Sequence, residues 1–399
     1  MFRPLAMLFL TPLIVSASVC AQDSVRFGTL IGAYGNKQGI AVVTDSQIAT
    51  LDENNHVVLS SEPGQKLLKL DDRTVVAVAG LEFVPVTTMH SLSASTLALI
   101  ANYRVQVPQF PFDRLLRGIS GTLQFYLTTI TEIKSKTHLR TNETFSPVEV
   151  ILAGYDIDGT AKIGKIKVQY IQLPGGGFIA EEIFRKIDTV GEEFTHETGG
   201  INELAEALLT TSRSGVYNPP VLQKYWLALQ NGTRKDLTVE ELAQLGDSLE
   251  NETHGKTDLV GGLSQTAILE AGHARTLVAP DVFQPLITPF PLMVAKDSSF
   301  SGGGVLVLKG SPNTVIFYDT VRFSGRVQPV GQPPLPISNL TLDGNIFVNC
   351  SFENVVIYYG GEQAYLDSSS VFIKTHFWFG PNVPADVQNY YRKLIGQAN

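Results

Sequence analysis

Residues 24–46 read SVRFGTLIGAYGNKQGIAVVTDS, and this stretch decides how the chain begins to fold. Two strand-like runs, Ser24–Tyr34 and Gly39–Thr44, flank residues 35–38, Gly-Asn-Lys-Gln, which favour a turn. The pattern therefore predicts a β-hairpin at the start of the folded chain.

The elements expected after this hairpin follow an order that indicates a layered fold. A buried strand is predicted over Thr74–Gly80, and apolar residues at helical spacing predict helices over Pro85–Tyr103 and Phe112–Lys134. The remaining expected elements are strands at 148–155 and 161–173, helices at 201–211, at 219–229 and from residue 238, and a closing strand at 263–269. This order predicts an α+β fold in which two stacked sheets are covered by helices on both outer surfaces, a four-layer αββα sandwich.

The N-terminus resembles a secretory signal. Arg3 precedes an apolar stretch, and the chain reaches Val19-Cys20-Ala21 before Gln22. We expect residues 1–21 to be removed and the product to be secreted or periplasmic. Since no later segment is apolar for long enough to span a bilayer, no transmembrane segment is expected after signal removal.

The composition describes a globular chain and excludes several kinds of partner. Of 399 residues, 44% are hydrophobic and 17% are charged, which can supply a buried core. The formal net charge is −8 and no basic cluster stands out, so nucleic acid is not an expected partner. Cys350 alone remains once Cys20 leaves, the seven His lack ligand spacing, and residues 174–177 lack the Lys of a nucleotide loop. No disulfide, metal or other cofactor is therefore expected.

The last hundred residues differ in kind from the rest. A segment rich in Pro, Ser and Gly, residues 280–304, predicts a linker, and residues 305–399 predict a separate β-rich domain. Within it a Leu-Asp pair followed by two Phe occurs twice, with Phe347 and Phe352 in the first copy and Phe372 and Phe377 in the second. This repeat favours rungs of a small right-handed β-helix or solenoid, with a small sandwich as the alternative.

Five short motifs in the first half carry a resemblance to a known family. They are Gly28-Thr29, Val43-Thr44-Asp45-Ser46, Gln65-Lys66-Leu67, Val78-Ala79-Gly80 and Ala153-Gly154-Tyr155-Asp156. In sequence and spacing they resemble the β subunits of proteasomes and their bacterial relatives, which are N-terminal-nucleophile (Ntn) hydrolases. Residues 178–237 match that family only weakly. The resemblance implies a proteasome-like hydrolase domain over residues 29–279, and it is compatible with a homo-oligomer.

The resemblance also implies roles for particular residues. Thr29 would be the nucleophile, its own freed amine the base, Asp45 and Lys66 would tune the site, and the Gly80 N–H would stabilise the oxyanion. The chemistry is sound because a Thr hydroxyl is a weak nucleophile that needs a neighbouring base. An α-amino group with a pKa of about 8 can serve as that base, and a buried ammonium favours the ionised hydroxyl.

Some residues depart from the family pattern and leave alternatives open. Active relatives carry Asp-x-x-Ser-Gly-Gly near the closing strand, whereas residues 257–262 place Asp258 one position too close and Val260 where the Ser belongs. The amine of Thr29 is freed only if residues 22–28 are removed as a propeptide. A shifted alignment places Phe27 at the nucleophile position and abolishes catalysis.

The sequence thus supports two hypotheses of different class. The first is an exported threonine peptidase or amidase with catalytic residues Thr29, Asp45, Lys66, Gly80 and Asp258, acting on a peptide or other amide substrate. The second is a non-catalytic scaffold or binding protein that keeps its N-terminal extension. The mature N-terminus distinguishes them.

Overall fold

The structure is a computed structural model of the 399-residue chain. It describes residues 29–47, 49–51, 57–59, 64–80, 83–85, 93–128, 145–173, 178–210, 220–270, 273–278, 292–302, 304–305, 315–325, 336–362 and 364–396. The expected signal (1–21), the expected propeptide (22–28) and the first part of the expected linker lie outside these residues.

One five-stranded antiparallel sheet contains the predicted hairpin. Its spatial order is β12 (Thr195–Gly200), β1 (Leu30–Asn36), β2 (Gly39–Thr44), β13 (Gln265–Glu270) and β14 (His273–Val278). β1 and β2 pair from Asn36 opposite Gly39 outward, which confirms the hairpin and its turn. β2, near the start of this half, thus pairs with β13, near its end.

The second five-stranded sheet is also antiparallel. Its order is β11 (Phe178–Thr189), β10 (Ala161–Gln172), β9 (Phe145–Tyr155), β6 (Thr74–Gly80) and β5 (Leu67–Lys69). The bounds of β6 are those predicted. β11 and β12 were not predicted, because their charged residues interrupt the apolar alternation that identifies a half-buried strand.

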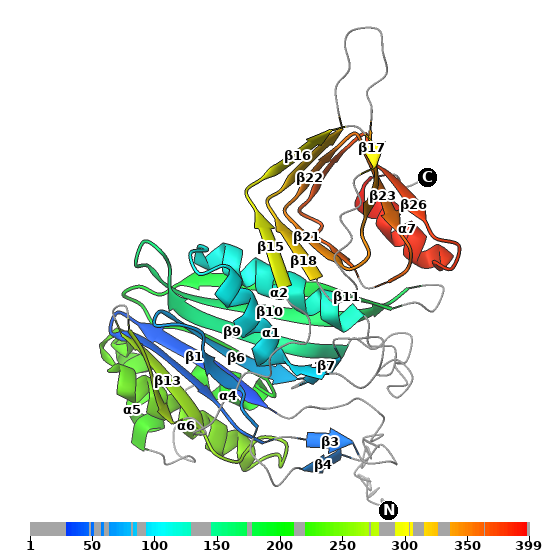
Figure 1. Cartoon of the computed structure of the whole chain (residues 1–399). Helices are drawn as coiled ribbons and strands as arrows, with labels where there is room; N and C mark the ends of the chain where they lie inside the picture. Colours follow the sequence, from blue (N-terminus) through cyan, green and yellow to red (C-terminus); the bar gives the residue numbers. More distant parts are fainter. Residues whose placement is uncertain are drawn as a thin grey trace, which may run out of the picture.

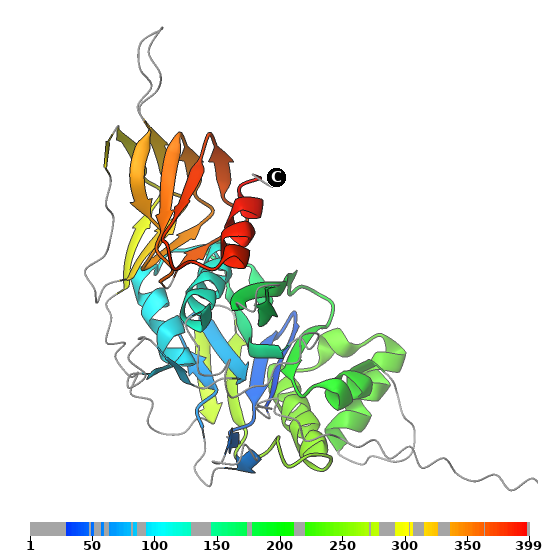
Figure 2. The same ribbon diagram turned by 90° about the vertical axis from the view of Figure 1, so that its right-hand side faces the viewer.

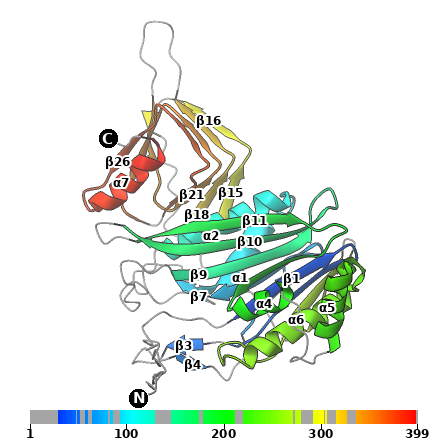
Figure 3. The same ribbon diagram turned by 180° about the vertical axis from the view of Figure 1, so that it is seen from behind.

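Helices cover the outer faces of these sheets (Figure 1, Figure 3). α1 (Thr96–Gln106) and α2 (Phe112–Thr128) lie on the second sheet; α4 (Glu203–Thr210), α5 (Pro220–Asn231) and α6 (Val239–His254) lie on the first. The predicted capping box at the start of α6 is present, with Thr238 and Glu241 bonding reciprocally.

The prediction of a helix over Pro85–Tyr103 was wrong in its first half. The helix begins only at Thr96, and β8 (Ser93–Ser95) pairs instead with β7 (Phe83–Pro85). Ladder hydrogen bonds with β7 therefore satisfy this backbone, where the apolar spacing alone favoured a helix. A second short hairpin joins β3 (Ala49–Leu51) to β4 (Val57–Leu59), and a 3₁₀ turn covers Arg234–Asp236.

Three apolar clusters hold this half together. One contains side chains from both five-stranded sheets, such as Ile31 and Val42 with Val75 and Ile151. A second joins the second sheet to α1 and α2, and a third joins the first sheet to α4, α5 and α6. Alternate residues of each strand therefore enter different clusters, as the period of two in a strand requires.

The C-terminal part is a coil of parallel strands, as predicted. Within the described residues it makes four turns, each with one strand in each of three parallel sheets. The strands are β15 (Leu292–Lys296), β16 (Ser299–Gly302), β17 (Gly304–Val305), β18 (Val315–Asp319), β19 (Arg322–Gly325), β20 (Ile337–Thr341), β21 (Asn345–Val348), β22 (Ser351–Glu353), β23 (Val355–Tyr359), β24 (Tyr365–Leu366), β25 (Val371–Ile373) and β26 (His376–Phe379). α7 (Ala385–Leu394) lies beside the last turn (Figure 1).

Two details of the sequence prediction need correction. Residues 292–302, expected to be linker, already form the first turn of the coil, because their Ser and Gly suit a corner and short strands. In the repeat, Phe352 pairs with Phe372 rather than with Phe377. Phe300, Phe323, Phe352 and Phe372 stack with successive ring centroids 5.4, 5.3 and 5.3 Å apart.

The coil packs against the first half and shares part of its core. Figure 2 shows its strands standing against α1 and α2. Phe317 of β18 and Val348 of β21 are buried in the same cluster as the helices, and the rings of Tyr103 and Phe317 are 4.9 Å apart. Apolar surface of the coil thus covers the helical layer, while the predicted division into two domains stays a prediction.

Arg114 of α2 forms ion pairs with the coil, and their contribution to the free energy of unfolding can be tested. Its guanidinium pairs with Asp297 at 2.9 Å and with Asp319 at 2.7 Å, and the Asp319 side chain is only 2% exposed. Arg114→Met leaves Asp319 buried without that partner, so we expect the free energy of unfolding to fall by about 2–3 kcal/mol. Arg322→Met, which removes a pair on the coil's exposed surface, is the control and should cost less than about 1 kcal/mol in chemical denaturation. Equal losses would contradict a buried junction.

Candidate active site

Thr29, Asp45 and Lys66 meet at one end of the predicted hairpin. Thr29 immediately precedes β1, Asp45 immediately follows β2, and Lys66 immediately precedes β5 of the other sheet. The Lys66 Nζ donates a hydrogen bond to Thr29 Oγ1 and lies 3.3 Å from Asp45 Oδ1. All three are buried, with exposed fractions of 1%, 0% and 7% in chain order. Residues far apart in the sequence thus form one contact group.

The Asp45 carboxylate is fixed by backbone donors as well as by Lys66. Its Oδ1 accepts the Leu30 N–H at 3.2 Å, and its Oδ2 accepts the Gly261 N–H at 3.0 Å and the Gln47 N–H at 3.3 Å. Burial raises the pKa of Asp45 above its ordinary value, while the Lys66 ammonium and the Gly261 N–H act in the opposite direction. The carboxylate therefore locks the hairpin end to the loop after α6.

Lys66 is held at both its backbone and its side chain. The Gln265 side-chain oxygen accepts the N–H groups of Lys66 at 3.0 Å and Leu67 at 3.1 Å. The Nζ also donates to the carbonyl of Gln47, in addition to its contacts with Thr29 and Asp45. A buried ammonium with three oxygen neighbours is oriented toward the Thr29 hydroxyl rather than toward solvent.

Gly200 is a residue of this site that the sequence reasoning missed. The Thr29 carbonyl accepts the Ile201 N–H at 2.8 Å, and a Cβ on Gly200 would lie 1.9 Å from the same carbonyl oxygen. The backbone of Gly200 also has φ of 73°, which favours glycine. The doubled glycine at the end of β12 was the available signal, but β12 itself was not predicted.

A second missed residue is Glu149, which supports Gly200 from β9. Its Oε2 accepts the Gly200 N–H at 3.3 Å, and its Oε1 lies 2.8 Å from Lys167 Nζ. Lys165 lies 3.6 Å from the same carboxylate, and burial lowers the pKa of Lys165. Glu149 and its two Lys partners thus lie next to Gly200, which in turn contacts the Thr29 carbonyl.

Gly80 and Asp258 are placed differently from the first three predicted residues. Gly80 ends β6 with φ of 101°, directly after Ala79, whose Cβ would lie 3.2 Å from a Cβ on Gly200. It therefore belongs to the same neighbourhood. Asp258 is exposed in the loop after α6, and no hydrogen bond within the described residues joins it to Thr29. The loop instead contacts the site through Gly261.

Glu250 of α6, whose charge interacts with Asp45, makes the stability of the protein depend on pH. Burial raises the pKa of Glu250 to about 7; the Ser264 hydrogen bond opposes this, and the charges of Asp45 and Asp247 add to it. The folded state then holds a proton that the unfolded state loses near pH 4.5. Stability should therefore fall as pH rises from 4.5 to 7, by roughly 3 kcal/mol.

Glu250→Gln tests this dependence, because the amide oxygen can still accept from Ser264. We expect the variant to gain stability over the parent progressively across that pH window in denaturant titrations. For the control Glu193→Gln, at an exposed position, the difference in stability from the parent should not change across the same pH range. A variant curve parallel to the parent curve would disprove the assignment.

The described residues contain no group of three or more His, Cys, Asp and Glu side chains suited to a metal ion. Within the same residues, no helix is long and apolar enough to cross a membrane.

Comparisons with known proteins give a distant structural likeness only. No model of a protein family matches the chain, and no curated protein matches it. Among solved structures, the chain is similar to Anbu (ancestral beta-subunit) from Yersinia bercovieri, with 14% identity, TM-score 0.35, and 62% of this chain and 86% of that chain covered. It is also similar to an Anbu (Gly-1) mutant from Hyphomicrobium sp. strain MC1, with 15% identity, TM-score 0.35, and coverage of 64% and 89%.

These findings correct the family assignment drawn from the sequence motifs. Membership of the proteasome β-subunit-like Ntn hydrolases is contradicted, because no family model matches and the structural likeness is distant. Five motifs of two to four residues each were too short to establish a family, since such pairs as Gly-Thr are common.

Proposed function

We propose that this protein is an exported threonine amidohydrolase, a peptidase or amidase that acts through Thr29 once residues 22–28 have been removed. The observation that carries the proposal is the buried contact of the Lys66 ammonium with the Thr29 hydroxyl, with Asp45 beside it. In the same proposal, the two five-stranded sheets and their helices form a four-layer αββα sandwich. The proposal rests on this geometry and not on family membership.

The buried ammonium is the feature that favours chemistry over simple packing. Burying a cation is costly unless it is paired, and here its partners are one carboxylate, one carbonyl and one hydroxyl. An ion pair that only stabilised the fold would not need a hydroxyl beside the ammonium. A Thr oxygen that accepts from an ammonium is stabilised when it loses its proton, which is the state that attacks a carbonyl.

The proposed reaction has two steps. Thr29 Oγ1 attacks the amide carbonyl carbon while its proton passes to the freed Thr29 amine, directly or through a water. The Thr29 ammonium then gives this proton to the substrate nitrogen, and the C–N bond breaks. The product amine leaves, and an ester on Thr29 remains for water to hydrolyse. Gly80 would donate its N–H to the oxyanion, a contribution of roughly 3 kcal/mol in comparable sites.

Removal of the propeptide uses the same Thr29 hydroxyl within one chain, but the Thr29 nitrogen is then still an amide and cannot act as the base. A water would instead take the hydroxyl proton and pass it to the departing amide nitrogen. Attack by Thr29 on the carbonyl of Gly28 would convert the peptide bond to an ester, and water would then release residues 22–28. The N–H of Ile201 and the close approach of Gly200 hold the Thr29 carbonyl still during this step. The alternative function is a non-catalytic scaffold that retains the extension.

The mature N-terminus is the decisive measurement. We expect intact-mass analysis of protein secreted by its own signal to show a chain that begins at Thr29. A chain that begins at Gln22 after prolonged incubation would favour the scaffold. Native mass spectrometry of the same sample also tests self-association, which stays a prediction.

A further inference from the structure

A cavity lies at the end of β6 that is farther from Thr29. Its volume is about 340 Å³, and it is lined by Arg73, Thr74, Arg104, Tyr155 and Phe112, among others. Thr74 begins β6, whereas Ala79 near the candidate site almost ends it, so about 17 Å of strand separate the two places. The cavity therefore does not belong to the Thr29 site.

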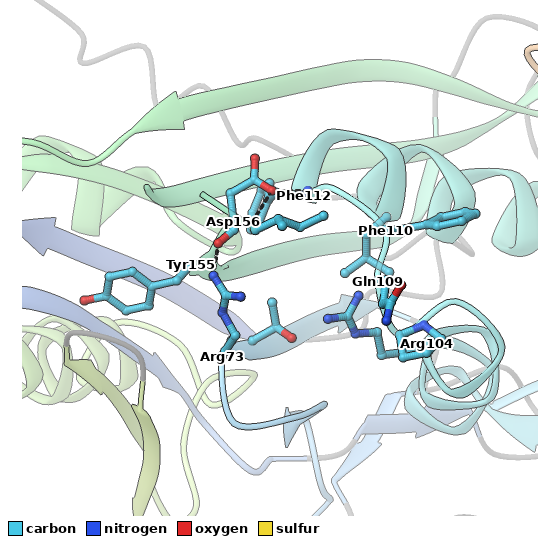
Figure 4. Close-up of a pocket in the computed structure, with 11 residues that line it drawn as sticks. Arg73, Arg104, Gln109, Phe110, Phe112, Tyr155 and Asp156 are labelled. Atoms are coloured by element: carbon cyan, nitrogen blue, oxygen red, sulfur yellow. Dashed lines mark hydrogen bonds between the residues drawn. The ribbon is translucent and has the colours of Figure 1, made fainter. Parts of the chain in front are cut away.

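Two guanidinium groups enter this cavity from different elements. Arg73 comes from the turn before β6 and Arg104 from α1, and Figure 4 shows both side chains reaching into the space below Gln109 and Phe112. Like charges that converge in a partly enclosed space repel, unless an anion lies between them. A bound anion would offset this repulsion.

The carboxylates nearby neutralise only one of these charges. Asp71 Oδ2 lies 2.6 Å from Arg104 Nε, and Asp156 is occupied by Lys162 at 2.8 Å and by the Phe112 N–H. Arg73 donates to the backbone carbonyl of Asp156 and forms no ion pair among the described residues. Its remaining donors are directed at the cavity, where a carboxylate could accept two of them.

Apolar walls define the rest of the ligand. Thr74 is 2% exposed, and its side chain hydrogen-bonds the Asp71 carboxylate, so it forms part of the wall and is not a donor for the ligand. The rings of Phe112 and Tyr155 supply apolar surface beside the charges.

We propose that this cavity binds a small organic carboxylate with an apolar body, held by Arg73. The guanidinium of Arg73 pairs with the carboxylate, and the aromatic walls contact the apolar part. This site is independent of the proposed hydrolase chemistry.

Titration of the full chain with 3-phenylpropionate, followed by NMR or calorimetry, tests the site. We expect a Kd of about 1 mM for so small a ligand, and no binding of the neutral 3-phenylpropanamide at the same concentrations. Arg73→Gln should weaken binding at least about tenfold. Arg322→Gln, which removes the same charge from the coil surface, should leave the Kd unchanged.

Arg73→Lys keeps the proposal testable if the Gln variant does not fold, because it retains the charge but loses the fork; it should bind with intermediate affinity. Equal binding of the amide and the acid, or equal affinity in Arg73→Gln and Arg322→Gln, would overturn the assignment. Absence of binding by the parent, or tighter binding of phenyl phosphate than of the carboxylate, would overturn it as well.

Discussion

Thr29→Ala is expected to abolish both removal of residues 22–28 and hydrolysis of amide substrates. The variant lacks the only oxygen that the Lys66 ammonium could activate as a nucleophile in this contact group. We expect a mature chain that begins at Gln22, and a loss of activity of at least about 10⁴-fold against a panel of peptide anilides. A β-lactone probe, which acylates an activated hydroxyl and adds its full mass, should label the parent at Thr29 and leave the variant unlabelled.

Two matched variants separate chemistry from packing in this experiment. Thr29→Ser keeps the hydroxyl and should retain processing, with activity within about tenfold of the parent. Thr44→Ala removes another buried hydroxyl, at the end of β2, and should change neither readout by a comparable factor. Undiminished hydrolysis by Thr29→Ala would remove the proposed mechanism.

Lys66→Met is expected to have the second largest effect, and on two quantities at once. Activity should fall by about 10³-fold, because the hydroxyl loses the cation that stabilises its ionised form. Stability should fall by about 3 kcal/mol, because the fully buried Asp45 carboxylate loses its charged partner. Both follow from one contact, so activity and chemical denaturation are measured on the same preparation.

The double variant Lys66→Met with Asp45→Asn distinguishes the two effects. The Asn side chain leaves no unpaired charge but turns its NH₂ toward a backbone N–H, so part of the lost stability should return, while the activity should not. Lys37→Met, which breaks the exposed pair with Asp236, is the control and should cost less than about 1 kcal/mol with full activity. Recovery of activity in the double variant would show that Lys66 acts through stability alone.

If the protein is instead a non-catalytic scaffold, Thr29, Asp45 and Lys66 have only a structural role. Lys66 and Asp45 would then join the two sheets at one end, and Thr29 would be a satisfied polar residue. Lys66→Met would still destabilise the protein, but the mature chain would begin at Gln22 in every variant. The stability and processing readouts therefore separate the two functions.

The sequence by itself determined the elements whose signals are local. The turn at residues 35–38 specified the hairpin of β1 and β2, the capping box at Thr238 specified the start of α6, and the apolar run 74–80 specified β6. The repeated aromatics indicated the parallel coil, because stacked Phe rings recur wherever its turns repeat. Thr29, Asp45 and Lys66 were named together only through the motif resemblance, since they border three different strands.

Only the tertiary structure decided which distant segments complete the site and the core. Gly200 and Glu149 reach Thr29 through pairing of β12 with β1 and packing of β9 beneath them, and no spacing along the chain encodes that meeting. Asp258 was misplaced for the same reason, since the loop after α6 turns Gly261 rather than Asp258 toward Asp45. The coil's docking on α1 and α2 likewise depends on apolar faces that match in three dimensions, and a linear pattern records each face but not its partner.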